Sequence, residues 1–177
     1  MKKVFLTVLT VLFAVGLFIR PVFAAEMKIG FLDVAKVFDE YKKTKEQDAS
    51  LEAQAKLKQA DRDKLVSEIT RLRDELELLS EKGKQDKQAV IDEKVKKLQE
   101  YDTVTRNDLR KKRDNMVADI LKEIDAVVQD YGKKQGFDII LNDKVLVYKK
   151  ENLDVTADIL KTLNSQYQPA SAAKTQK

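Results

Sequence analysis

Residues 65–83 read LVSEITRLRDELELLSEKG, and the spacing of their apolar side chains decides the fold. Leucine or isoleucine recurs at positions 65, 69, 72, 76 and 79. These alternating steps of four and three are typical of a coiled-coil seam, the stripe along which two helices pack. The polar segment that follows contains Gly83, the only glycine between Gly30 and Gly132. Because glycine tolerates a positive φ, we expect the chain to reverse direction at Gly83.

The same spacing extends backwards to Val34 without interruption. Ten of the fourteen seam positions from 34 to 79 are apolar, and the polar exceptions fall in the middle at Thr44, Asp48, Lys58 and Arg62. A buried leucine contributes about 1.5–3 kcal/mol, so this middle part should bend more easily than either end. The main apolar seam residues of this first run are Val37, Tyr41, Leu51, Leu65, Ile69, Leu72, Leu76 and Leu79.

A second periodic run follows Gly83 and ends near Tyr131, with a one-residue shift in spacing near Met116. At 1.5 Å per residue each run would form a helix of about 70 Å. Two helices of matched length predict an antiparallel hairpin over residues 34–131 rather than a compact bundle. The seam residues near the end of the second run are Leu121, Ile124 and Val128.

The segments that flank the hairpin, residues 25–33 and 132–165, predict a small body containing β-strands. Met27 to Leu32 alternates as a strand does, and the runs 137–141 and 145–148 indicate a β-hairpin turning at 142–144. Asp33 is the expected N-cap of the first helix and Thr156 that of a short last helix. The candidate residues of this body are Ile29, Phe31, Phe137, Ile139, Leu141, Val145 and Val147.

This body would be too small to be stable alone. It has about 55 residues, and domains of that size usually need disulfides, metals or association. The chain contains no cysteine. We therefore expect a cyclic homo-oligomer, whose subunit number the pattern leaves open. The polar tail, residues 166–177, is expected to be disordered.

The first 24 residues have the pattern of a secretory signal peptide. Lys2 and Lys3 precede an apolar run from Val4 to Ile19, and we expect cleavage after Ala24. An uncleaved anchor is the alternative, although a spanning helix needs about 20 apolar residues. Cleavage removes Lys2, Lys3 and Arg20 from the 34 basic residues, which leaves 31 against 30 acidic ones. A nearly neutral secreted chain argues against nucleic-acid binding.

The composition also argues against an enzyme. The chain has no histidine and no cysteine, and its carboxylates are spread along expected helix faces. We expect no catalytic residue, no metal site and no cofactor. The basic run Arg110–Arg113 could contact anionic groups, but consecutive helical residues point in different directions. A solvated face paired with Asp108 and Asp114 is the favoured interpretation.

Both ends of the expected mature chain resemble the Skp/OmpH family of periplasmic chaperones. The matching segments are KIGFLDVAKVF at 28–38, GFDIIL at 136–141, the run at 145–148 and LDVT at 153–156. The resemblance implies an α+β, mostly α fold in which a long antiparallel coiled-coil hairpin projects from a small β-barrel-type oligomerisation body. It further implies a homotrimer whose arms enclose a cavity. Lipopolysaccharide or anionic-lipid binding occurs in some members, but its positions do not match securely here.

The resemblance implies an ATP-independent periplasmic holdase that binds unfolded outer-membrane β-barrel proteins and prevents their aggregation. The alternative is a structural or scaffolding coiled-coil protein of the cell envelope. A holdase needs many weak contacts, and arm residues off the seam are the candidates, although each could equally be an ordinary apolar surface residue. They are Leu57, Val66, Leu78, Val90, Tyr101 and Val104.

Overall fold

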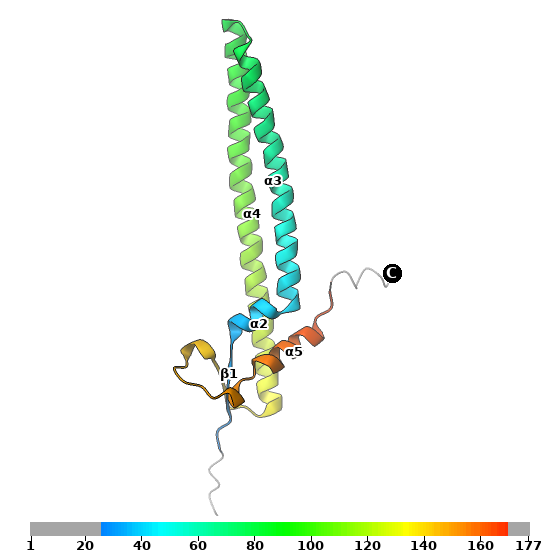
Figure 1. The fold of residues 1–177 in the computed structure, drawn as a ribbon, viewed down its shortest axis with the longest axis vertical. Coiled ribbons are helices and arrows are strands. Elements are labelled where there is room, and N and C mark those ends of the chain that lie inside the picture. Colours follow the sequence, from blue (N-terminus) through cyan, green and yellow to red (C-terminus); the bar gives the residue numbers. More distant parts are fainter. Residues whose placement is uncertain (1–25, 170–177) are drawn as a thin grey trace, which may run out of the picture.

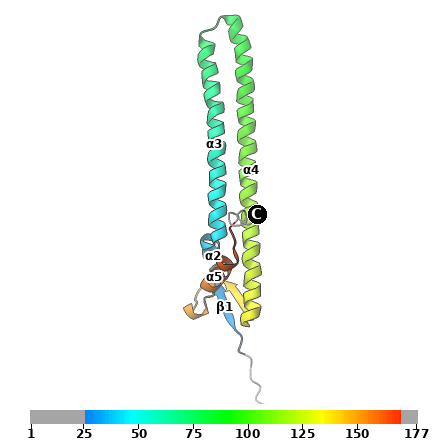
Figure 2. The same ribbon diagram turned by 90° about the vertical axis from the view of Figure 1, so that its right-hand side faces the viewer.

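The computed structural model describes residues 26–169. A long antiparallel hairpin of two helices, α3 (Lys42–Glu77) and α4 (Glu81–Gln135), stands on a small base (Figures 1 and 2). We call this hairpin the arm. The base contains β1 (Ile29–Leu32), α2 (Val34–Glu40), β2 (Ile139–Asn142) and α5 (Thr156–Gln166), with 3-10 turns at Asp143–Val145 and Glu151–Leu153. The expected helical hairpin on a small base with strands is confirmed.

The reversal at the far end of the arm lies at residues 78–80, ahead of Gly83. Leu78 has φ −91° and ψ 0°, and Ser80 is extended with φ −67° and ψ 162°. These angles suit any L-residue, so the turn needs no glycine, and Gly83 lies in the first turn of α4. Within residues 26–169 the only positive φ belongs to Gly136, at +69°, where α4 ends.

The predicted continuous helix from Val34 is interrupted at Tyr41. This residue has φ −63° and ψ 127°, so α2 ends at Glu40 and α3 begins at Lys42. Figure 1 shows α2 lying across the foot of the arm instead of continuing it. The seam residues Val37 and Tyr41 are consequently buried in the base. The causes of this break are contacts from distant segments, described below.

The predicted β-hairpin of residues 137–148 is wrong. β2 pairs in parallel with β1, with Ile29 opposite Ile139 and Leu32 opposite Asn142. The Asn142 side chain then accepts a hydrogen bond from the Lys144 N–H and starts a 3-10 turn. The chain therefore turns away from the sheet, and residues 145–148 form no strand in the single chain. The described residues form a two-stranded sheet rather than a barrel.

Two separate apolar clusters hold the molecule together. The larger lies where α2, α4 and α5 meet, and Val37, Ile120 and Ile159 at its centre have no exposed surface. The smaller lies in the distal arm around Ile69, Leu72 and Ile91. No residue of 45–68 or 92–115 is fully buried, so the middle of the arm lacks an apolar core.

Two helix starts of the base test the capping predictions. Asp33 is the N-cap of α2, as predicted, and its Oδ1 accepts a hydrogen bond of 2.9 Å from the Lys36 N–H. Thr156 does not cap α5, because Val155 is the N-cap. The buried Thr156 hydroxyl instead accepts a hydrogen bond from the Asp33 N–H at 3.0 Å. It therefore ties the start of α5 to the end of β1.

Candidate functional site

The middle of the arm is joined by polar contacts instead of apolar packing. Arg62 Nε donates to Asp102 Oδ1 at 2.9 Å, and the Tyr101 hydroxyl donates to the Lys58 carbonyl at 3.0 Å. Arg62 and Lys58 are two of the polar residues that interrupt the predicted seam. Each polar side chain takes a position where a leucine would close the gap between the helices. The two helices are therefore held together here by side chains that also reach water.

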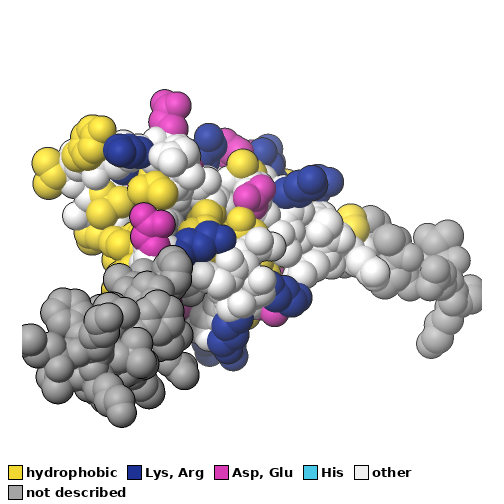
Figure 3. Space-filling view, turned by 90° about the horizontal axis from the view of Figure 1, so that it is seen from below, with side chains coloured by type: hydrophobic (Ala, Val, Ile, Leu, Met, Phe, Trp, Pro, Cys, Tyr) yellow, Lys and Arg dark blue, Asp and Glu magenta, His cyan; other side chains and the backbone are white. Residues whose placement is uncertain are grey.

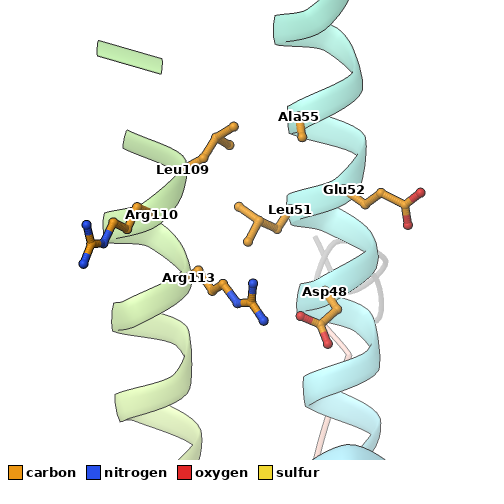
Figure 4. A pocket seen from close by; sticks show the side chains of 7 residues that line it. All are labelled: Asp48, Leu51, Glu52, Ala55, Leu109, Arg110 and Arg113. Atoms are coloured by element: carbon orange, nitrogen blue, oxygen red, sulfur yellow. The ribbon is translucent and has the colours of Figure 1, made fainter. Parts of the chain in front are cut away.

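A groove of about 500 Å³ lies next to this region, between α3 and α4. In Figure 4, Leu51 and Leu109 point toward each other across the gap, and Arg113 extends toward the side of α3 that carries Asp48. The small side chain of Ala55 leaves the gap unfilled. The groove is lined by Asp48, Leu51, Glu52, Ala55, Leu109, Arg110 and Arg113.

The charges of the groove are divided between its two walls. Asp48 lies on the α3 side and Arg113 on the α4 side, whereas the charged ends of Glu52 and Arg110 point away from the gap in Figure 4. A hydrogen bond from Lys56 lowers the pKa of the exposed Glu52 carboxyl, which is ionised at neutral pH. Two leucines flanked by one acidic and one basic side chain suit polypeptide segments in which apolar and charged side chains alternate. It contains no nucleophile paired with a base.

The candidate contact residues of the arm differ in how accessible they are. Leu57, Leu78 and Val104 are strongly exposed, and Val90 is exposed to 42%. Val66 and Tyr101 are half-buried, and the Tyr101 hydroxyl is engaged by Lys58. The strongly exposed three are thus the most accessible candidates of this set. The groove around Leu51 and Leu109 was not predicted from the sequence. Leu51 is a predicted seam residue and Leu109 lies in the second periodic run, so both were expected to pack, and only the polar seam residue Asp48 indicated a gap.

The apolar seam residues are also buried to different degrees. Leu79 at the tip and Leu121 near the base are exposed, although the pattern placed both on the seam. Ile120 faces inward in place of Leu121, because the buried positions of α4 near the base follow steps of four residues, at Met116, Ile120 and Ile124. Ile124 is buried and Val128 is half-buried in the same cluster.

A second apolar surface lies at the base. Figure 3 shows hydrophobic side chains gathered on one side of this end. Phe31 and Phe137 belong to the interior of the single chain, since Phe31 is buried and Phe137 packs on the base cluster. The exposed apolar residues of the base are Met27, Ile29, Ile139, Leu141, Val145, Val147, Tyr148 and Leu153, and we call them the base surface.

The basic run Arg110–Arg113 forms ion pairs along its own helix. Lys112 Nζ lies 3.0 Å from Asp108, and Arg110 lies 3.9 Å from Asp114. Lys112 also donates to Gln54 across the arm at 2.9 Å. The prediction of a paired, solvated face is confirmed for these two residues.

The described residues hold no helix long and apolar enough to cross a membrane. The predicted signal peptide, with its cleavage after Ala24, lies outside them. Tyr167, which the sequence placed in a disordered tail, packs in the base, with its ring centroid 5.8 Å from that of Tyr41.

Comparisons with known proteins give one family and one fold. The family model described as "Outer membrane protein (OmpH-like)" matches residues 28–163. No curated protein matches the sequence. The solved structure of a candidate outer membrane chaperone (OmpH-like) from Caulobacter crescentus superposes with a TM-score of 0.75 and 12% sequence identity. The alignment covers 81% of this chain and 87% of that one. At such low identity the structural likeness shows the fold alone.

Proposed function

This chain belongs to the OmpH-like outer membrane protein family, and on that premise we propose that it is a periplasmic holdase chaperone. It binds unfolded outer-membrane β-barrel proteins between helical arms and keeps them from aggregating without ATP. The cleaved signal peptide predicted for residues 1–24 would deliver it to the periplasm.

The main observation that supports this proposal is that the middle of the arm has no apolar core between its two helices. A holdase must bind many different segments weakly and release them without a nucleotide cycle, which favours spread contacts over one deep pocket. The groove offers two half-buried leucines flanked by Asp48 and Arg113, and Leu57 and Val104 are exposed on the same part of the arm. Strands of outer-membrane barrels alternate apolar and polar residues, which matches this mixture.

We further propose that the chain assembles as a homotrimer through the base surface. The sheet of β1 and β2 has two strands only, and isolated pairs of strands are marginally stable in water. Five of the seven residues predicted for the oligomerisation body are exposed in the single chain: Ile29, Ile139, Leu141, Val145 and Val147. Association would cover them and extend the sheet into the β-barrel-type body that the family resemblance implies.

An aggregation assay tests the holdase proposal. A β-barrel protein unfolded in urea is diluted into buffer with and without the purified chain of residues 25–177, and light scattering is followed. We expect scattering to be suppressed at stoichiometric amounts of the chain, without nucleotide. Undiminished scattering would favour the alternative, a scaffolding coiled coil of the envelope.

A further inference from the structure

The interruption of the helix at Tyr41 has no local cause. Residues 34–77 contain neither glycine nor proline, and the residues flanking Tyr41 are Glu40 and Lys42, both good helix formers. The 3,4 spacing of seam positions also runs through this point without a shift, with Val34, Val37 and Tyr41 followed by the polar positions 44 and 48. By local propensity alone, α2 and α3 would be one helix. Contacts from elsewhere in the chain must therefore maintain the break.

Two residues from the C-terminal end of α5 and just beyond provide such contacts. The Lys42 N–H, at the start of α3, donates to Asn164 Oδ1 at 2.9 Å. The Tyr167 hydroxyl donates to Glu46 Oε2 at 2.7 Å, and its ring meets the ring of Tyr41 edge-on. We call Asn164 and Tyr167 the clasp. In a continuous helix the Lys42 N–H would bond to the Phe38 carbonyl, so Asn164 is needed only when the helix is broken.

Residues of α4 also contact the chain at the break, around Tyr41. The Tyr41 hydroxyl donates to Glu123 Oε2 at 3.2 Å, and Lys43 forms an ion pair with the same carboxylate. Next to them the Thr44 hydroxyl is buried with no hydrogen-bond partner among the described residues. In a continuous helix this hydroxyl could donate to the Glu40 carbonyl four residues earlier. The broken form therefore leaves unsatisfied a group that the continuous form satisfies.

The register in which α3 pairs with α4 is compatible with a continuous helix from residue 34. Ion pairs across the arm join Lys43 to Glu123, Arg62 to Asp102 and Glu68 to Lys94. The two residue numbers of each pair add up to about 164, which is the register expected of two antiparallel helices of equal rise. Extended backwards, this register brings residue 37 opposite residue 127 and residue 34 opposite residue 130. Position 127 is Val127 and position 130 is Asp130, and the neighbours Val128 and Tyr131 are, like Val127, apolar and only partly buried.

We propose that Tyr41 is a two-state joint: with the clasp engaged the helix is broken as seen here, and with the clasp released α2 and α3 join into one helix that packs along α4. The change redirects the arm relative to β1 and the base. It would alter the spacing between arms in an oligomer. The proposal does not depend on the chaperone function, because it concerns one chain only.

Distances between two spin labels test the joint. The chain has no cysteine, so Ala35→Cys and Ala53→Cys, both at exposed positions on either side of the joint, can be labelled uniquely. A continuous helix places these residues about 27 Å apart along its axis, and a break brings them closer. Labelled chain is mixed with an excess of unlabelled chain so that only distances within one chain are measured. Asn164→Ala removes the clasp bond, and Asn115→Ala on the exposed face of α4 is the matched control.

We expect Asn164→Ala to raise the fraction of chains at the long distance at least threefold over the unmutated chain and over Asn115→Ala. A distance distribution identical in all three would overturn the proposal.

Lys42→Pro provides a second, opposite test. Proline is tolerated at the first position of a helix, and the extended angles of Tyr41 suit a residue that precedes proline. Proline within a continuous helix is strongly unfavourable. We expect Lys42→Pro to abolish the long distance in the Asn164→Ala background. If the long distance persists there, it does not come from a continuous helix and the joint is refuted.

Discussion

Thr156 connects three segments of the base through its backbone and side chain. Its hydroxyl accepts from the Asp33 N–H at 3.0 Å, and its own N–H donates to Asp154 Oδ1 at 2.8 Å. The adjacent Val155 N–H donates to the Phe31 carbonyl at 3.0 Å. These bonds, one of which uses a buried hydroxyl, fix the end of β1 against the start of α5.

Thr156→Val should lower the free energy of unfolding by about 1–3 kcal/mol, because it leaves the Asp33 N–H without its acceptor. Thr103→Val, on the exposed side of α4, is the control and should change stability by less than about 0.5 kcal/mol. Urea unfolding at one protein concentration measures both. Equal midpoints for the two variants would show that the Thr156 bond contributes nothing.

Ile120 and Leu121 are neighbours with opposite environments in the single chain. Ile120 has no exposed surface, whereas Leu121 is 42% exposed. We expect Ile120→Ala to destabilise the chain by about 2–5 kcal/mol and Leu121→Ala by about 1 kcal/mol or less. Thermal or urea unfolding of the two variants measures both losses of stability. The reverse order would mean that the seam at the base follows the spacing predicted from the sequence, which includes Leu121.

At the scale of elements, the arm consists of a base cluster and a distal cluster separated by a polar middle. Hydrogen exchange should therefore be faster for amides in the middle, such as those near Lys58 and Asp102, than for those near Ile120. Equal protection along the arm would contradict a softer middle.

Replacing the pair Arg62 and Asp102 by two leucines should close the middle of the arm. Both side chains are partly buried, and exchanging such a pair for apolar residues is often neutral or stabilising. We expect slower exchange there, together with weaker suppression of client aggregation if the open middle binds clients. Lys96→Leu with Glu100→Leu, an exposed pair within α4, adds the same side chains elsewhere and should change neither property. Unchanged suppression by the Arg62 and Asp102 variant would remove the middle of the arm as the binding region.

The arm could be predicted from sequence because its seam spacing is a local signal repeated over many turns. The break at Tyr41 could not, since it depends on Glu123, Asn164 and Tyr167, which lie about 80 to 125 residues further along the chain. The parallel pairing of β1 with β2 is equally non-local, whereas the run at 145–148 has a strand-like pattern but no partner in the single chain. The groove could not be predicted, because Leu51 and Leu109 follow the apolar spacing of residues that pack between two helices.

At the scale of the whole molecule, a long arm stands on a base whose surface is apolar. Val147→Asp places a charge in the base surface and should shift the chain toward monomers in sedimentation, because burying an unpaired carboxylate is costly. Leu57→Asp, on the exposed arm, should leave the assembly intact. An unchanged assembly of the Val147 variant would show that the chain associates through another surface.

Sedimentation of residues 25–177 with and without a urea-unfolded β-barrel protein examines assembly and client binding together. We predict a homotrimer that takes up the unfolded protein into a larger, discrete complex. If the chain is a stable monomer that does not bind the unfolded protein, both the proposed assembly through the base surface and the proposed holdase function are contradicted.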